Sequence, residues 1–363
     1  MNQQVLATTA LETPVPQGEE FRDRNVRRRL PAEELAPLTR LSNWKSLQAL
    51  LQTVCLVCMT AALGGFGLKL LRNTSGAEPW LGFGMIVIAV LLMGCWQHAL
   101  AIISHESTHY RLFANRSAND VIGRIAGILI GVSTYSYRIV HRVHHNNLFE
   151  AIDPDLALMA GYPRGKMYLV KKLLKDLAGL TAWRNYLYFF GAPAMNASTG
   201  RKQKPLDDTT ERLRDMALAE RWVVVAFHLA MPVAMFAIGC GLEYLVLWIL
   251  PAVTVQAAIL RLRAVAEHGA PSDTSTPLGA ARTNIDLPLW ARVALFPHHV
   301  NYHLEHHLYP AVPHYHLPAL HERLKAHGIL EGAEVRPFAA TMRRVFAPRP
   351  PVAAAAAAAP ADQ

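Results

Sequence analysis

The sequence predicts an all-α integral membrane protein with four transmembrane helices and a cytoplasmic helical cap that carries a histidine-rich site. Two observations support this fold class. The chain of 363 residues is 52% hydrophobic, with a mean hydropathy of +0.15, and its apolar residues gather in blocks. Three clusters of histidines lie beside these blocks or downstream of them. The blocks predict the helices, and the clusters predict where the site lies.

Four apolar blocks approach the ~20 residues that a spanning helix needs. They cover residues 47–71, 80–103, 222–241 and 244–260. A further run, 121–135, is shorter and rich in glycine, so we expect a half-buried or interfacial helix there.

A second candidate for an interfacial helix covers residues 166–190. Its apolar residues share one side of a helix, lysines occupy the other side, and aromatic residues follow. This pattern favours a helix lying among lipid headgroups. The alternative is an amphipathic helix packed on the cap.

Basic residues orient the predicted membrane helices. Seven arginines and lysines precede the first block, and residues 161–205 carry nine against one acid, Asp176. Cytoplasmic loops carry such an excess, so we expect both termini and the segment 104–221 in the cytoplasm. All three histidine clusters then lie on the same side. We expect a multi-pass protein of the bacterial inner membrane, and no nucleic-acid partner, because no binding motif accompanies the charge.

The predicted domain organisation has three parts. Residues 1–46 form a cytoplasmic N-terminal segment, whose first ~20 residues are polar and expected to be disordered. Residues 47–330 form the membrane domain. Residues 331–363 form a C-terminal tail, and the run of proline and alanine predicts disorder from about residue 348.

The three histidine clusters indicate a metal enzyme. Neutral imidazole suits iron, zinc, copper and nickel, and a spacing of i, i+4 places two side chains on one helix face. One ion takes about four to six ligands, so eight imidazoles predict two ions in one site. The eight are His105 and His109 in HESTH, His141, His144 and His145 in HRVHH, and His303, His306 and His307 in HLEHH.

These three boxes, in this order, resemble the membrane-bound fatty acid desaturase family from about residue 47 to about residue 321. The third box reads NYHLEHHLYP, residues 301–310. The resemblance implies a non-haem centre of two iron ions, O2 as co-substrate, a fatty acyl substrate whose carrier stays open, and contact with membrane lipid. It also implies a ninth ligand at His268, which closes the fourth apolar block. The chain has no HPGG haem segment and no ferredoxin-type cysteine cluster. A separate electron donor of the ferredoxin or cytochrome b5 type, with its reductase, is therefore implied.

The reaction implied by the resemblance is O2-dependent insertion of a double bond into an acyl chain. Acyl hydroxylases and a fatty acid decarboxylase that forms terminal alkenes have similar boxes, and the ligand set does not separate them. A decarboxylase needs carboxylate capture near the metals. Arg138, Arg142 and Arg263 are candidates for this role, because a guanidinium binds a carboxylate bidentately.

Several side chains are candidates for supporting the ligands. Asp153 and Asp155 follow the second box and could accept hydrogen bonds from ligand imidazoles, although a helix cap or turn explains them equally well. Asn301, which opens the third box, is a further candidate. Three glutamates sit beside box histidines or His268 and are expected to support the site or face solvent, because adjacent helical residues do not share a face. These are Glu106, Glu267 and Glu305.

The remaining histidines are expected to play smaller roles. His98 lies on a similar helix face to His105 and is expected to support the site. His298 and His299 are reserve metal ligands. Four histidines after the third box are expected to face solvent: His314, His316, His321 and His327.

Two other classes of function compete with this interpretation. HESTH also fits H-E-x-x-H, the signature of zinc proteases, which would suggest an intramembrane zinc metalloprotease. That hypothesis leaves the other two boxes without a role. A transporter is the second alternative, but the clustered histidines and the lack of an evident internal repeat argue against it.

Overall fold

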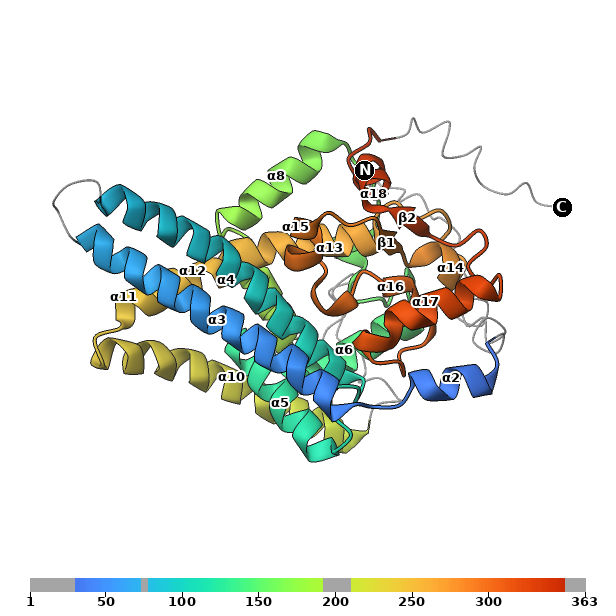
Figure 1. Ribbon diagram of the computed structural model, residues 1–363, viewed down its shortest axis with the longest axis horizontal. Coiled ribbons are helices and arrows are strands. Elements are labelled where there is room, and N and C mark those ends of the chain that lie inside the picture. The colour runs from blue at the N-terminus through green and yellow to red at the C-terminus, as the bar shows by residue number, and fades with distance from the viewer. Residues whose placement is uncertain (1–29, 73–77, 192–209, 350–363) are drawn as a thin grey trace, which may run out of the picture.

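The structure is a computed structural model that describes residues 30–72, 78–191 and 210–349 (Figure 1). It is mainly helical. The disorder predicted for the first ~20 residues and for most of the C-terminal end falls outside the described residues.

Within the described ranges, four stretches are long and apolar enough to cross a membrane. They are α3 (Asn43–Arg72), α4 (Glu78–Thr108), α10 (Glu211–Ala237) and the stretch Gly241–His268. The last is divided into α11 (Gly241–Tyr244), a π-helical turn η1 (Leu245–Ile249), α12 (Leu250–Val253) and α13 (Val255–His268). Each predicted apolar block overlaps one of these stretches, so the four long apolar helices are confirmed.

Helices α3 and α4 approach closely because glycines face one another between them. A Cβ added to Gly67 would lie 2.9 Å from the carbonyl oxygen of Gly82. A Cβ added to Gly82 would lie 2.6 Å from the carbonyl oxygen of Gly67. Small residues at such a contact let two backbones meet. On its outer side α3 exposes large apolar side chains, including Trp44, Met59 and Phe66, as a lipid-facing surface would.

The other described elements pack beside the long helices and beyond their ends, and we call them together the cap. They are α2 (Ala32–Leu38), α5 (Arg116–Leu129), α6 (Thr134–Asn146), α7 (Leu156–Met159), α8 (Lys166–Leu177), α9 (Ala182–Gly191), α14 (Pro277–Ala280), α15 (Leu289–Ala294), η2 (Pro297–His299), α16 (His303–Leu308), η3 (His314–His316), α17 (Leu317–Ala326) and α18 (Phe338–Val345). In Figure 1, α3, α4 and α10 occupy one side of the view, and α2, α14, α16 and α17 occupy the other. The apolar core of the cap includes Leu148, Leu304, Leu308, Leu320 and Leu324.

A two-stranded parallel sheet departs from the all-α expectation. Strand β1 (Thr283–Ile285) pairs with β2 (Val335–Pro337), and Thr283 lies opposite Val335. An ion pair just before each strand holds the two segments together: Arg282 Nε donates to Glu334 Oε2 at 2.7 Å, and both side chains are 1% exposed. The pairing joins residues 331–349 to the cap, and Phe338 and Val345 of α18 are buried against other elements.

The two predicted interfacial segments are helical. The run 121–135 contributes to α5, where Val121 and Ile125 are each 50% exposed while Gly123 and Ala126 are buried. The stretch 166–190 forms two helices, α8 and α9, rather than one. Between them Gly179 has a φ of +74°, a conformation that suits glycine and ends the first helix.

Candidate metal centre

Four elements bring the nine predicted histidines together. His105 lies near the end of α4, with His109 just after it, and His268 is the last residue of α13. The other six belong to the short helices α6 and α16, three on each. The site therefore lies where two of the long helices enter the cap.

The nine histidines form two groups. Within each group, the nitrogen atoms able to bind a metal all lie within 4.8 Å of one another. The five-histidine group consists of His105, His109, His141, His145 and His306, and the four-histidine group consists of His144, His268, His303 and His307.

Helix geometry explains how α6 and α16 serve both groups. An α-helix turns about 100° per residue, so residues four apart share a face and the residue at i+3 points about 100° away from the one at i+4. On α6, His141 and His145 join the five-histidine group while His144 joins the other. On α16 the division is reversed: His303 and His307 join the four-histidine group. Each HxxHH helix therefore lies between the two groups.

The Nε2 atoms of the five-histidine group converge. Those of His105 and His141 are 2.8 Å apart, and His145 Nε2 lies 3.0 Å from both His141 Nε2 and His306 Nε2. His109 Nε2 is buried without a hydrogen-bond partner among the described residues. Converging imidazole nitrogens in a buried space are the arrangement that a bound cation stabilises, so these residues fit a metal ion.

The four-histidine group has the same arrangement. His303 Nε2 lies 2.7 Å from His268 Nε2 and 3.1 Å from His307 Nε2. All four side chains are buried. The ring of His144 lies 5.0 Å from the rings of His268 and His307, measured between centroids. This donor set fits a second ion.

The outer nitrogens of several of these rings face acceptors. His144 Nδ1 donates to Asp153 Oδ1 at 3.0 Å, and His268 Nδ1 donates to the Ala280 carbonyl oxygen at 3.1 Å. His105 Nδ1 lies 3.3 Å from Glu106 Oε1. A proton held on Nδ1 leaves the Nε2 lone pair directed inward, which is how such acceptors orient metal-binding histidines.

Burial also keeps most of these imidazoles neutral, the form that binds a metal. It lowers the pKa well below its usual value for His141, His145, His303, His306 and His307. His144 differs: burial disfavours its charge, but the carboxylates beside it, above all Asp153, raise its pKa to about 9.

Of the two aspartates predicted to support the ligands, Asp153 makes the closer contact. It is fully buried, and besides His144 it accepts from the backbone nitrogens of Phe149 and Asp155. Asp155 Oδ2 lies 3.8 Å from His144 Nδ1, and its side chain is 31% exposed. Asp153 thus acts both as a turn residue and as a partner of His144.

All three glutamates beside histidines are buried, so the alternative that they face solvent is wrong. Glu106 contacts His105, and Glu267 Oε1 lies 3.7 Å from His303 Nδ1. Glu305 accepts hydrogen bonds from Thr283 Oγ1 and from His321 Nδ1. The prediction that His321 faces solvent is wrong, because its ring packs beside Tyr302 and it is 7% exposed.

Two of the three candidate arginines are paired with acidic side chains. Arg138 donates to Asp120 Oδ1 and to the Ser107 carbonyl oxygen, and so ties α6 to α4 and α5. Arg263 donates to Glu267 at 2.7 Å, and Arg142 is on an exposed position of α6.

Asn301, predicted to support a ligand histidine, forms hydrogen bonds with Asn284 in the chain before α16. The side-chain Nδ2 of Asn301 donates to the Asn284 carbonyl oxygen at 3.0 Å, and the backbone carbonyl oxygen of Asn301 accepts from the backbone nitrogen of Asn284.

The reserve ligands His298 and His299 belong to neither histidine group and lie in a separate pocket. His314, predicted to face solvent, lies in the same pocket and is 5% exposed, so that prediction is wrong.

The fold and the site define a helical protein with two adjacent histidine centres at the ends of membrane-length helices. Comparison with protein families agrees with this class: the fatty acid desaturase model matches residues 78–338. The chain belongs to the fatty acid desaturase family.

Individual relatives are distant. A dihydrorhizobitoxine desaturase of Bradyrhizobium elkanii is 26% identical over 62% of this chain, and an acyl-lipid (9+3)-(E)-desaturase of Dimorphotheca sinuata is 26% identical over 66%. Each match covers 64% of the relative's own length. An sn-1 acyl-lipid omega-3 desaturase (ferredoxin) of Nostoc sp. (strain 36) is 25% identical over 68% of each chain.

Proposed function

We propose that this protein is an O2-dependent fatty acyl desaturase whose nine histidines hold two iron ions. The observation that carries the proposal is the division of nine histidines, seven of them buried and two partly buried, into two neighbouring groups with converging nitrogens. In this proposal the five-histidine group holds one ion and the four-histidine group holds the other.

Bound iron would supply the one-electron redox chemistry that O2 reduction and oxidation of an unactivated methylene require. In the overall reaction an acyl chain loses two hydrogen atoms and gains a double bond. O2 takes up these two hydrogens, two external electrons and two protons and leaves as two water molecules. The protein supplies the position of the acyl chain and a site shielded from water.

The chain's own residues prepare the site. Asp153, Glu106 and the Ala280 carbonyl fix the orientation of three imidazoles through their Nδ1 atoms. Burial of seven of the nine histidines limits access of bulk water, which limits side reactions of an oxidising centre. These groups position ligands and are not proposed to touch the substrate.

An apolar cavity of about 610 Å³ offers a place for the hydrocarbon chain. It lies among α9, α10 and α12, and its walls include Trp183, Val224 and Val253. Ser133, which also lines it, is the N-cap residue of α6. His141 lies eight residues further on, or about 12 Å along the helix. We propose that the acyl chain passes from this cavity towards the histidine groups.

The electron donor is proposed to be a separate protein of the ferredoxin or cytochrome b5 type. One relative's name specifies ferredoxin, and the net charge of +9 favours an acidic partner. We further propose that both termini and the histidine site lie in the cytoplasm of a bacterial cell, as the distribution of basic residues predicts.

The alternatives have less support. A decarboxylase needs a cation to capture the carboxylate, but Arg138 and Arg263 are both engaged with acidic side chains. In a zinc protease Glu106 would act as a base beside the metal, whereas here it contacts His105 Nδ1 and the backbone nitrogen of His314. Relatives named as desaturases favour desaturation over hydroxylation.

Product analysis tests the reaction. Cells that express the protein with iron, O2 and a compatible reductase should contain new unsaturated acyl chains of unchanged carbon number, detected by gas chromatography of total lipid. A variant with His144→Ala and His306→Ala is the control and should give no such product. Volatile 1-alkenes in the headspace, or hydroxylated chains, would each overturn the proposal.

A further inference from the structure

A buried segment of the chain after α14 lies between the end of α13 and the start of α16. Its side chains at three consecutive positions are buried: Arg282 is 1% exposed, and Thr283 and Asn284 are fully buried. Their hydrogen bonds reach α13 and α16, the two helices that carry three residues of the four-histidine group. The proposed reaction gives these side chains no role. The segment is placed to fix how the two helices meet.

Arg282 holds the end of α13. The last four carbonyl groups of an α-helix have no partner within the helix, and α13 ends at His268. Arg282 Nη1 donates to the Ala266 carbonyl oxygen at 3.1 Å, and the backbone nitrogen of Arg282 donates to the Glu267 carbonyl oxygen at 2.9 Å. Arg282 Nη2 donates to the Ala270 carbonyl oxygen at 3.1 Å, just beyond the helix. A cation at the C-terminus of a helix is also stabilised by the helix dipole. These three hydrogen bonds, called the clamp below, hold the backbone on both sides of His268.

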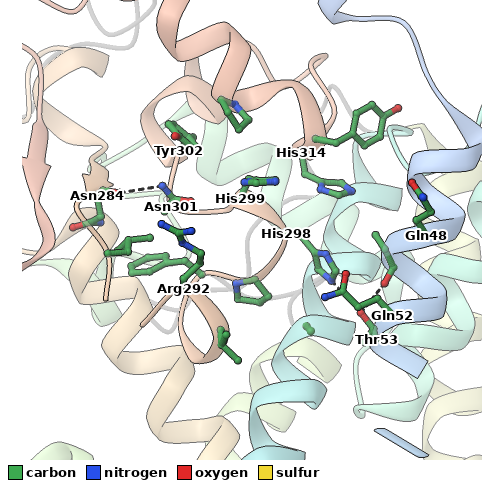
Figure 2. Close-up of a pocket in the computed structure, with 18 of the residues that line it drawn as sticks. Gln48, Gln52, Thr53, Asn284, Arg292, His298, His299, Asn301, Tyr302 and His314 are labelled. Carbon is green, nitrogen blue, oxygen red and sulfur yellow. Dashed lines mark hydrogen bonds between the residues drawn. The ribbon is translucent and has the colours of Figure 1, made fainter. Parts of the chain in front are cut away.

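Asn284 reinforces the clamp and connects it to α16. Its side-chain Nδ2 donates to the Ala266 carbonyl oxygen at 3.1 Å. The backbone nitrogen of Asn284 donates to the Asn301 carbonyl oxygen, and Asn301 Nδ2 donates to the Asn284 carbonyl oxygen, each at 3.0 Å (Figure 2). Helix α16 begins at His303, two residues after Asn301. The end of α13 is therefore tied to the start of α16.

Thr283 and Glu334 hold the segment from its other sides. Thr283 Oγ1 donates to Glu305, which lies among the histidines of α16. Arg282 Nε donates to Glu334 Oε2 at 2.7 Å, which fixes the plane of the guanidinium. Arg336 donates to both carboxylate oxygens of Glu334, each at 2.9 Å. Glu334 would therefore keep a charged partner if Arg282 were replaced.

The position of His268 depends on this arrangement. Of the nine proposed ligands it is the one on α13, and it belongs to the four-histidine group. Its Nδ1 donates to the Ala280 carbonyl oxygen, and its Nε2 lies 2.7 Å from His303 Nε2. Ligand side chains have to be held within about 0.5 Å of the binding geometry. A shift in the last turn of α13 would move His268 away from the other ligands of its group, whereas the five-histidine group has no member on α13.

We propose that Arg282 is a positioning residue for the four-histidine group, which clamps the last turn of α13 so that His268 faces His303 and His307. This inference rests on the proposed function, which assigns one ion to each histidine group. Loss of the clamp should weaken binding of the ion in the four-histidine group and leave the other ion in place.

Arg282→Gln tests the clamp, and Arg336→Gln is the matched control. Both changes remove an arginine that pairs with Glu334, and of the two arginines Arg282 is the one that donates to α13. Metal remaining on the purified, iron-loaded protein is measured after dialysis against a graded chelator. Arg282→Gln should hold one of its two ions about 10- to 100-fold more weakly, whereas Arg336→Gln should hold both as the wild type does. Arg282→Lys should fall between them, since an ammonium group keeps the charge but cannot form the same fork.

Double variants show which ion is lost. Arg282→Gln combined with His268→Ala should hold no less metal than His268→Ala by itself, because both changes act on the same group. Arg282→Gln combined with His109→Ala should lose metal from both groups. Losses that do not add identify residues that act on a common site. A loss that adds to that of His268→Ala would overturn the proposal.

Hydrogen exchange of the same iron-loaded proteins gives a second readout, which does not depend on turnover. In Arg282→Gln the backbone amides of residues 265–270 should exchange at least about tenfold faster than in the wild type, and those of residues 103–109, at the end of α4, should be unchanged. Arg336→Gln should exchange as the wild type does in both segments. His268→Ala keeps the clamp, so exchange at residues 265–270 should stay slower in it than in Arg282→Gln, and this comparison separates the clamp from the loss of an ion.

Two further outcomes have a stated meaning. Metal retention and exchange in Arg282→Gln equal to those of the wild type would overturn the proposal. A wild type that binds a single ion would contradict the proposed function instead, and exchange at residues 265–270 would still show whether Arg282 clamps α13. If Arg282→Gln fails to fold, Arg282→Lys, which keeps the buried charge, carries both comparisons.

Discussion

His145 and His307 stack across the boundary between the two histidine groups, with ring centroids 4.2 Å apart and an interplanar angle of 22°. His145 belongs to the five-histidine group and His307 to the four-histidine group. The two histidine groups are therefore in direct contact through these two rings.

Asp153→Asn should weaken metal retention. The amide can keep the hydrogen-bond geometry, but it removes the negative charge next to His144 Nδ1. Loss of such a partner lowers metal affinity by about 10- to 100-fold. Iron remaining after dialysis against a graded chelator measures the effect. Asp155→Asn is the control, because Asp155 lies 3.8 Å from the same nitrogen and is 31% exposed. Equal iron loss in both variants would contradict a special role for Asp153.

Val224→Trp should block the apolar cavity between α9, α10 and α12. A larger side chain there would displace the hydrocarbon, and we expect turnover of a long acyl chain to fall at least about tenfold while iron content stays unchanged. Val223→Trp changes the neighbouring residue, which is 46% exposed and absent from the cavity lining. If both variants retain wild-type turnover, the acyl chain does not use this cavity.

Glu334→Gln should destabilise the cap in a pH-dependent way. Burial alone would raise the pKa of Glu334, but Arg336 and Arg282 lower it to about 2 from an ordinary value of 4.5. A depressed folded-state pKa stabilises the protein above pH 4.5, by about 3 kcal/mol. This stabilisation is lost as the pH falls from 4.5 towards 2.

Chemical unfolding in detergent at several pH values measures this effect. The difference between wild type and Glu334→Gln should be largest at neutral pH and shrink below pH 4.5. Glu331→Gln, at an exposed position three residues earlier, should unfold like the wild type throughout. A difference that stays constant down to pH 3 would show that the charge of Glu334 is not the cause.

Reporter fusions test the proposed topology. A reporter after Arg344 should lie in the cytoplasm, together with one at the N-terminus, because basic residues flank the membrane helices on that side. A reporter inserted after Arg72, between α3 and α4, should lie on the opposite side. A cytoplasmic signal after Arg72 would contradict the proposed orientation.

The sequence predicted the four long helices because each is an apolar run of sufficient length. It also predicted which histidines gather, because HxxHH on a helix presents imidazoles on neighbouring faces. It did not predict how they divide, since that depends on α6 and α16 lying between the two groups. The pairing of β1 with β2 was missed because strands of three residues carry no periodic signal.

The supporting contacts were harder to predict. Glu305 and His321 lie 16 residues apart, and only the packing of α17 against α16 brings them together. His314 looked like part of a polar tail because HYH is polar in sequence. In the fold its backbone nitrogen donates to Glu106, and the residue lines the same cavity as His298. Burial of polar residues by long-range packing leaves no local pattern.

The metal content of the purified protein tests the central claim most directly. Elemental analysis of wild type should give about two irons per chain and little zinc. His109→Ala and His268→Ala each change one group and should lower iron towards one per chain, while His228→Ala, which belongs to neither group, should retain two. A fully active protein with one zinc per chain, or two irons retained in both His109→Ala and His268→Ala, would contradict the assignment of one ion to each histidine group.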